Sequence, residues 1–230
     1  MTHQEIIKKT VNFTKSELKN AEGGHDWFHI ERVWNTSKLI TSTEPHANLL
    51  IVELAALLHD IADSKFHNGD EEIGPRKTKN FLESLKIPTE IIIHVVKIIE
   101  NISFKGGHTI KTFKSLELDI VTDADRLDAL GAIGIARAFN YGGFKKRPLF
   151  DPNQEPNLNM SKEEYKKSNS PTINHFYEKL LLLFDNFKTL KGKELAQSRH
   201  IFLKTFLLQF FNEWYDYNLN LLPSSFDISE

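Results

Sequence analysis

The stretch LAALLHDIAD, from Leu54 to Asp63, places a histidine and an aspartate at the end of a strongly apolar segment. Its apolar residues recur at helical spacing and leave almost no polar face, which predicts a buried helix. Burying an imidazole or a carboxylate is costly unless each has a strong partner. A divalent metal ion is one such partner for His59 and Asp60, and other elements would then supply the remaining ligands.

Two further segments contain candidate ligands. WFHIERVW, residues 27–34, places His29 on the same helical face as Val33. IVTDADRLD, residues 120–128, interrupts an apolar helical pattern with acidic residues. A His-Asp pair alone is weak evidence, because core histidines are often only hydrogen-bonded. Two imidazoles and two carboxylates suit Mn, Fe, Co, Ni or Mg better than structural zinc, and they leave positions for water or phosphate. Such a set would be His29, His59, Asp60 and Asp125.

Helical spacing of apolar residues extends along most of the chain, so an all-α fold is predicted. No hairpin dipeptide lies between alternating strand patterns. The run Ile91–Ile99 could be strand or buried helix, and its neighbours favour helix. Asp26, which follows Gly23-Gly24, is a candidate N-cap for the helix that contains His29. The predicted helices cover Ile6–Leu18, His29–Ile40, Leu50–Ile61, Ile91–Ile99, Leu116–Leu130, Tyr165–Leu190 and Glu194–Trp214.

A segment rich in Gly, Pro and Asn, YGGFKKRPLFDPNQEPNLN, runs from Tyr141 to Asn159. A loop of this length in a compact domain is usually a lid, a binding loop or disordered. No repeat and no clear linker divides the chain. We therefore predict a single helical domain over residues 1–230. Its core covers residues 20–140, the long loop residues 141–160, and additional C-terminal helices residues 161–216.

The composition excludes several classes of protein. The 230 residues are 40% hydrophobic and 26% charged, which is ordinary for a soluble globular protein. The 29 Lys and Arg residues against 31 Asp and Glu give a net charge of -2, so nucleic-acid or membrane-surface binding is not expected. The absence of cysteine excludes disulfides, thiolate zinc sites and cysteine nucleophiles. Without a signal-like or membrane-spanning apolar run, a cytoplasmic location is expected.

Taken together, the motifs resemble those of the HD-domain superfamily of metal-dependent phosphohydrolases. The pattern is H…HD…D, carried by LLHDIAD and DADRLDALGAIGIARAF. More narrowly, HDWFHIERVW, AALLHDIADSKFH and NYGGFKKRP resemble single-domain bacterial HD hydrolases, over most of the chain from about His25 to the helix with His200. The resemblance implies an all-helical HD-domain bundle, one divalent metal ion and hydrolysis of phosphate ester or phosphoanhydride bonds. Some relatives are nucleotide pyrophosphohydrolases.

The family pattern ADR selects Asp125 as the last ligand over its neighbours Asp123 and Asp128. The pair His25-Asp26 also spells HD, but it lies at a helix start. There we interpret Asp26 as a cap, and His25 as a residue that faces the substrate or supports the ligands, with a ligand role as the alternative. The metal ligands that the resemblance implies are therefore His29, His59, Asp60 and Asp125.

Some HD proteins bind a second metal ion through extra histidines between the HD pair and the final aspartate. In this interval the sequence has only His67, His94 and His108. Ile102 stands where close relatives often have a histidine before Ser-Phe. One metal ion is therefore predicted.

In the implied reaction, the metal ion polarises a phosphoryl oxygen and lowers the pKa of a bound water. Asp63 follows Asp60 by three residues and matches the acidic position of the HDxxE/D pattern. We assign Asp63 to orienting or deprotonating the attacking water, with a solvated helix-end residue as the alternative. The charge that develops on phosphorus requires cationic partners. The candidates for substrate binding are Arg32, Lys65, His67 and Arg126, and the residues that could also reach the substrate are Lys105, Lys145, Lys146 and Arg147.

The expected partner is a small phosphorylated molecule such as a nucleotide, and the chain is expected to be a monomer or a homodimer. A nucleoside triphosphate pyrophosphohydrolase is one form of this activity. The alternative function is a sensor module that binds a metal ion and a nucleotide without turnover.

Overall fold

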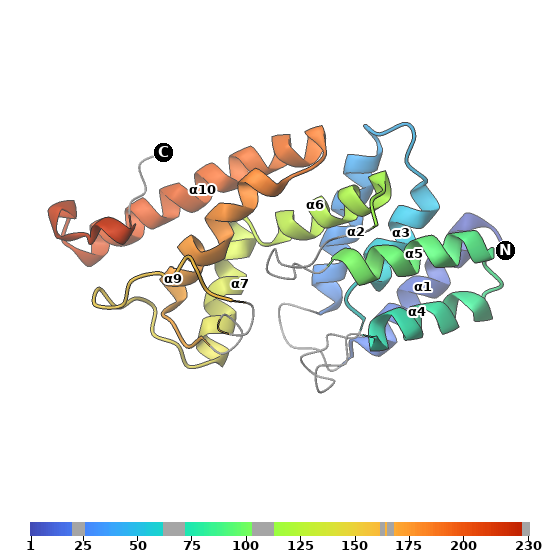
Figure 1. Ribbon diagram of the computed structural model, residues 1–230, viewed down its shortest axis with the longest axis horizontal. Helices are drawn as coiled ribbons and strands as arrows, with labels where there is room; N and C mark the ends of the chain where they lie inside the picture. The colour runs from blue at the N-terminus through green and yellow to red at the C-terminus, as the bar shows by residue number, and fades with distance from the viewer. Residues whose placement is uncertain (20–25, 62–71, 103–112, 162–163, 165–167, 227–230) are drawn as a thin grey trace. The chain divides into compact units, whose positions relative to one another are not determined.

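The computed structural model describes residues 1–19, 26–61, 72–102, 113–161, 164 and 168–226 (Figure 1). These residues form helices joined by turns and irregular segments, with no strand among them. The predicted all-α fold is confirmed. None of the described helices combines the length and the apolar character that a bilayer span requires.

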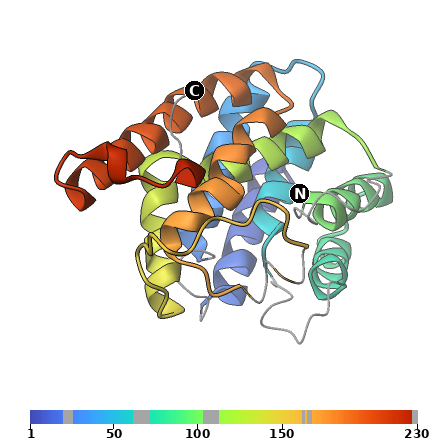
Figure 2. The ribbon, with the colours of Figure 1, turned by 60° about the vertical axis from the view of Figure 1, so that its left-hand side comes forward.

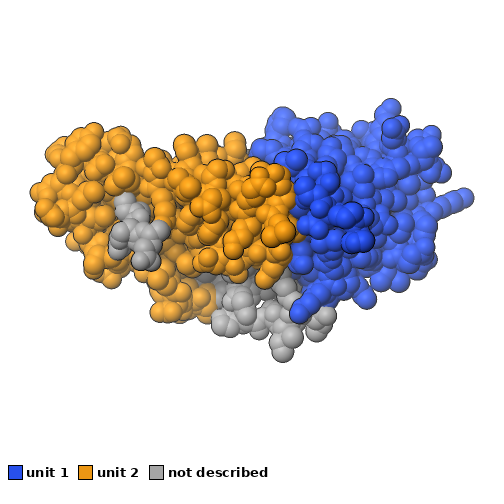
Figure 3. All heavy atoms as spheres, turned by 90° about the horizontal axis from the view of Figure 1, so that it is seen from above, with its two compact units in different colours: residues 1–125 blue, residues 126–230 orange. Residues whose placement is uncertain are grey.

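The chain divides into two compact units, which are coloured separately in Figure 3. The first unit comprises Met1–Asp125 and the second comprises Arg126–Glu230. The division falls within a helix, near its C-terminal end. The single domain expected from the sequence stays a prediction, and each unit is described separately below.

The first unit is a bundle of helices that surrounds α3, Leu49–Leu58. Contacts join α3 to α1, α2 and α5, and residues 54–58 are fully buried, as the buried-helix prediction required. α4 was not predicted, and its Pro75 lies in the first turn, where a missing N–H costs little. The other helices of this unit are α1 (His3–Glu17), α2 (Trp27–Thr41), α4 (Ile73–Ser84), α5 (Thr89–Ile102) and α6 (Leu116–Asp128), the last up to Asp125.

One acidic side chain lies within the apolar sequence of α3. Glu53 is only 6% exposed, and its two carboxylate oxygens have different partners. Trp34 donates its indole N–H to Glu53 Oε1 over 2.9 Å, and the His3 Nε2 atom lies 2.5 Å from Glu53 Oε2. Because a buried carboxylate requires such partners, Glu53 connects the start of α1 and the middle of α2 to α3.

The second unit is organised around α10, the long helix that Figure 2 shows beside the η2–η3 segment. Its core is aromatic: the Phe150 ring contacts the rings of Phe211, Phe226 and Trp214 at centroid distances of 5.1–5.3 Å. Such edge-to-face ring pairs add to the stabilisation from buried area alone. The described helices of this unit are α7 (Gly131–Phe144), α9 (Thr172–His175), the π-helix η2 (Phe176–Leu180), α10 (Leu190–Trp214), and the 3-10 helices η3 (Leu181–Asn186), η4 (Leu219–Leu221) and η5 (Ser224–Phe226).

The structure corrects the start of the predicted loop, because Tyr141–Phe144 form the last turn of α7. Gly142 is buried there, and a Cβ atom at this position would lie 2.1 Å from Thr172 Oγ1. The glycine is therefore required for α7 to approach α9, and the Gly-Gly pair does not mark the end of the helix. The predicted single helix Tyr165–Leu190 is also wrong in part, because α9, η2 and η3 follow one another with three different helical pitches.

The rest of the predicted loop, residues 145–160, is held to α9 and η2 by hydrogen bonds. The backbone N–H groups of Thr172 and Ile173 donate to the carbonyls of Pro148 and Leu149, each over 2.9 Å. The side-chain amide of Asn174 donates to the Gln154 carbonyl over 2.8 Å. Of the three possibilities for this segment, disorder is therefore excluded for these residues.

Candidate metal centre

The first candidate ligand, His29, is fixed by the N-terminus of α2. Asp26 is the N-cap, as predicted, and its side chain accepts a hydrogen bond of 3.0 Å from the backbone N–H of His29. His29 therefore lies in the first turn, where the cap sets the backbone. Its side chain is 1% exposed.

The second candidate ligand, His59, lies at the C-terminal end of α3 as its C-cap. The Nδ1 atom lies 2.8 Å from the carbonyl oxygen of Ala56, so Nδ1 carries the proton and donates it. This tautomer leaves the lone pair on Nε2. That atom is buried, and it has no hydrogen-bond partner within the part of the chain that the structure describes. A buried acceptor without a partner is costly, and a metal ion would supply the partner.

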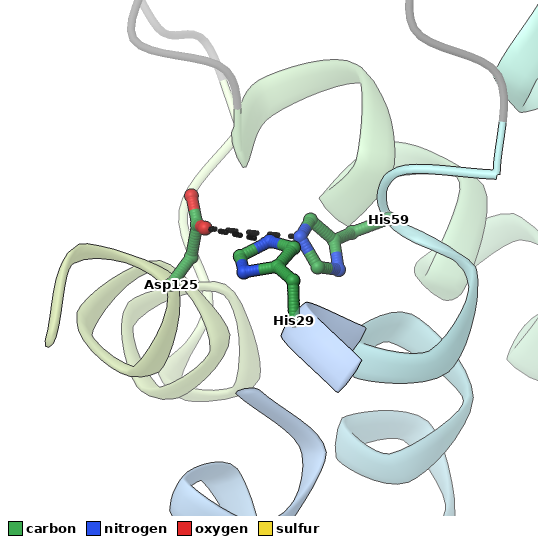
Figure 4. A group of neighbouring side chains, drawn as sticks. All are labelled: His29, His59 and Asp125. Atoms are coloured by element: carbon green, nitrogen blue, oxygen red, sulfur yellow. Dashed lines mark ion pairs between the residues drawn. The ribbon is translucent and has the colours of Figure 1, made fainter. Parts of the chain in front are cut away.

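The third candidate ligand, Asp125, faces both histidines from α6 (Figure 4). Its Oδ1 atom lies 3.5 Å from His29 Nε2 and 3.8 Å from His59 Nε2. The side chain is 37% exposed, whereas both imidazoles are buried. The group is thus closed on the histidine side and open to solvent at the carboxylate.

These three residues satisfy the requirements of a metal site. Their ligand atoms all lie within 4.8 Å of one another. Two ligands about 2.1 Å from one ion are separated by about 3–4 Å, which agrees with the two distances to Asp125 Oδ1. Two imidazole nitrogens and one carboxylate oxygen suit a divalent transition metal ion, and three protein ligands leave positions for solvent and substrate. The donor set and the unpaired His59 nitrogen therefore fit a divalent cation.

Asp60, the fourth ligand predicted from sequence, follows His59 directly and is half-buried. Its carboxylate is not part of the group whose ligand atoms lie within 4.8 Å of one another. Its role as a ligand stays a prediction.

The rivals of Asp125 occupy other environments. Asp123 is fully buried and precedes Asp125 by two residues, which places it about 200° away around the helix. Asp128 accepts a hydrogen bond of 2.7 Å from Arg137 Nη1. Of the three aspartates in this segment, Asp125 is therefore the one that the structure brings to the two histidines.

The predicted substrate-binding cations have different surroundings. Arg32 is half-buried and lies one turn after His29 on α2. Arg126 donates a hydrogen bond to the backbone carbonyl of Asn186, within the second unit. Arg147 likewise donates to the Ser168 carbonyl. The candidate site residues that lie outside the described ranges are His25, Asp63, Lys65, His67, Lys105 and His108.

One of the extra histidines considered for a second metal ion is engaged elsewhere. The Nε2 atom of His94 forms a 3.0 Å hydrogen bond with Ser115 Oγ and lies 3.4 Å from Glu117 Oε2. Its ring also packs edge-on against Phe113. Among the residues with a described position, the cluster of His29, His59 and Asp125 is the only group of three or more potential ligands close enough to share an ion. Sequence reasoning did not identify the Ala56 carbonyl that orients His59, although its position three residues earlier on a helix could have suggested it.

His175 lies at the end of α9 in the second unit. Burial, and then the charges of Lys179 and Arg147, lower the pKa of His175 from 6.5 to about 3. The folded chain therefore keeps this imidazole neutral while the unfolded chain takes up a proton below about pH 6.5.

Acidification should consequently destabilise the protein through His175. The stabilisation is complete above pH 6.5 and is lost progressively toward pH 3, by about 1 kcal/mol per pH unit, because the unfolded chain binds a proton that the folded chain excludes. Urea unfolding of metal-free protein between pH 7 and pH 5 measures this slope. His175→Gln should have a shallower slope than the wild type. Equal slopes for the two proteins would contradict the assignment.

Comparison with known proteins identifies similar sequences and structures. The family model of the HD domain matches residues 27–130. The Bacillus subtilis protein YpgQ is 35% identical over 198 residues, which cover 86% of this chain and 88% of YpgQ. The crystal structure of an HD-superfamily hydrolase from Bacillus thuringiensis is 43% identical, has a TM-score of 0.74, and is matched over 93% of this chain and 98% of that chain. The crystal structure of YpgQ in complex with ADP is 33% identical, with a TM-score of 0.74 and coverage of 93% and 97%.

Proposed function

Because the chain belongs to the HD-domain superfamily, we propose that it is a metal-dependent phosphohydrolase that acts on a nucleotide or another small phosphorylated molecule. The observation that carries this proposal is the convergence of His29, His59 and Asp125 from three helices, with a buried His59 nitrogen that has no hydrogen-bond partner among the described residues. Similarity to an HD-superfamily hydrolase supports hydrolysis as the reaction class.

The cofactor is proposed to be one divalent ion, drawn from Mn, Mg, Co, Ni or Fe. When bound, such an ion would polarise a phosphoryl oxygen and lower the pKa of water. Asp60 would act as a fourth ligand. His59 presents Nε2 to the ion because its Nδ1–H is held by the Ala56 carbonyl. Support of this kind, behind a metal ligand, fixes its tautomer and orientation.

The remaining roles belong to side chains around the ligands. Asp63 is proposed to orient or deprotonate the attacking water. Arg32 and Arg126, with Lys65 and His67, are proposed to bind the phosphoryl oxygens, where fixed positive charge stabilises the transition state.

A nucleotide is the proposed substrate because YpgQ has been crystallised in complex with ADP, and YpgQ resembles this chain over most of both sequences. A pyrophosphohydrolase would convert a nucleoside triphosphate to a monophosphate and pyrophosphate. A phosphatase would release inorganic phosphate, and a phosphodiesterase would open a cyclic nucleotide. The chain is proposed to act as a monomer or a homodimer.

The test is a metal and substrate panel. Metal-stripped protein is incubated separately with ATP, GTP, ADP, a deoxynucleoside triphosphate and p-nitrophenyl phosphate. Each substrate is tested with Mn, Mg, Co, Ni and Fe(II) in turn, and Fe(II) is used under anaerobic conditions. We expect turnover with at least one ion and an increase of about 100-fold or more over stripped protein. Chromatography of the products distinguishes pyrophosphate release from phosphate release. Nucleotide binding without turnover under every condition would reject the enzyme and favour the sensor module.

A further inference from the structure

Phe28 lies directly before the candidate metal ligand His29, and its side chain is exposed. It is 62% exposed, more than any other large apolar side chain described in the first unit. Exposure of this much of an apolar ring forgoes the stabilisation that its burial would give. The sequence therefore places an exposed aromatic ring beside the residue that begins the metal centre.

The neighbouring aromatic side chains of α2 differ from Phe28 in their contacts. Lys15 Nζ lies 4.4 Å from the ring centroid of Trp27, and Lys38 Nζ lies 4.0 Å from that of Trp34. Among the described residues, no ring stacking or cation–ring contact involves Phe28. Most of the Phe28 side chain is exposed to solvent, whereas the Trp27 and Trp34 rings each have a lysine ammonium over them.

Helical geometry places Phe28 on one face of α2 with Arg32, next to the face that carries His29. Successive residues are rotated by about 100°, so Arg32 lies about 40° from Phe28 and His29 lies about 100° from it. Around the helix axis, the direction of Arg32 therefore falls between the directions of Phe28 and His29. One turn of α2 therefore presents a metal ligand, a cation suited to phosphate and an exposed aromatic surface.

We propose that Phe28 is the surface on which the base of a nucleotide substrate stacks while its phosphates meet Arg32 and the metal centre. This inference rests on the proposed function and identifies a determinant of substrate class. Stacking of a base on an aromatic side chain tolerates different bases, because every base has a π-face. The site is then selective for nucleotides over simple phosphates, with little preference among bases at this position.

The test compares two probes that share a diphosphate group. Only one of them, ADP, also carries a base and a ribose. Isothermal titration calorimetry with Mn-loaded full-length protein measures binding of ADP and of inorganic pyrophosphate. Phe28→Ala should weaken ADP binding by about tenfold or more and leave pyrophosphate binding within twofold. Phe28→Trp should retain ADP binding. The matched control is Phe144→Ala, because Phe144 is 64% exposed but lies on α7, and it should leave both affinities unchanged.

The outcomes separate this inference from the proposed function. Unchanged ADP binding in Phe28→Ala, or equal weakening of both probes, would overturn the stacking role even in an active hydrolase. Selective loss of ADP binding in a protein that hydrolyses no substrate would support the stacking role and reject the enzyme. Metal content, measured in every variant, should equal that of the wild type, and a loss in Phe28→Ala would assign Phe28 to the architecture of the metal site instead.

Discussion

His59→Ala is expected to remove the metal ion and to lower phosphohydrolase activity by about a thousandfold or more. Loss of a group that only supports a metal ligand typically costs 10–100-fold in affinity or activity, so loss of the ligand itself should cost more. His59 supplies the buried nitrogen that has no other described partner, and alanine would leave a space beside Asp125 Oδ1. Elemental analysis of the purified variant and its turnover with saturating Mn measure the two effects.

His46→Ala is the matched control, because His46 is exposed and lies outside the ligand cluster. It should retain the metal content and activity of the wild type. Asp63→Asn provides a useful contrast, since a residue that acts on the water should lose turnover while keeping the ion. Wild-type metal content in His59→Ala would show that the cluster of His29, His59 and Asp125 does not hold the ion.

Gly134→Ala is expected to destabilise the protein by about 3 kcal/mol or more. A Cβ atom on Gly134 would lie 2.1 Å from the carbonyl oxygen of Ala129 and 2.4 Å from its carbonyl carbon. Both are backbone atoms of the turn between α6 and α7, so neither can rotate away as a side chain could. The thermal unfolding midpoint should fall by about 10 °C for a chain of this size.

The same helix offers a matched substitution at Gly143. Nothing lies within 4 Å of a Cβ atom placed there, and the residue is helical. Gly143→Ala should therefore stabilise the protein slightly, by about 0.5–1 kcal/mol, because alanine loses less conformational freedom than glycine. If both variants unfolded at the same temperature, the close approach of Ala129 to Gly134 would not limit stability.

The first unit could be predicted well from the sequence because its signals are local. Apolar periodicity identified α2, α3 and α6, and Asp26 was recognised as a cap from its position before the helix. The same periodicity placed His29 and Asp125 on helices that could converge. Periodicity could not show whether the Asp60 carboxylate reaches the candidate metal centre. The helix ends before His59, and the direction of the Asp60 side chain depends on the turn that follows.

The second unit was predicted less well because its structure depends on contacts distant in sequence. The Gly142-Gly143 pair resembles a loop, yet it belongs to the last turn of α7, where Thr172 occupies the space that a Cβ atom on Gly142 would need. The segment that follows Pro171 changes from α to π to 3-10 pitch, and apolar spacing does not distinguish these. Arg126 is a candidate for phosphate binding from the sequence, and its hydrogen bond to the Asn186 carbonyl could be recognised only in the structure.

The three residues of the candidate centre come from α2, α3 and α6, which are widely separated along the chain. During synthesis the histidines emerge well before Asp125, so a complete site cannot exist until most of the first unit has been made. The three candidate ligands therefore come together only through the packing of these helices, in contrast to small zinc modules whose ligands are close in sequence and whose folding is driven by the ion. A cation that binds only correctly assembled molecules would stabilise them and shift the population toward them by mass action.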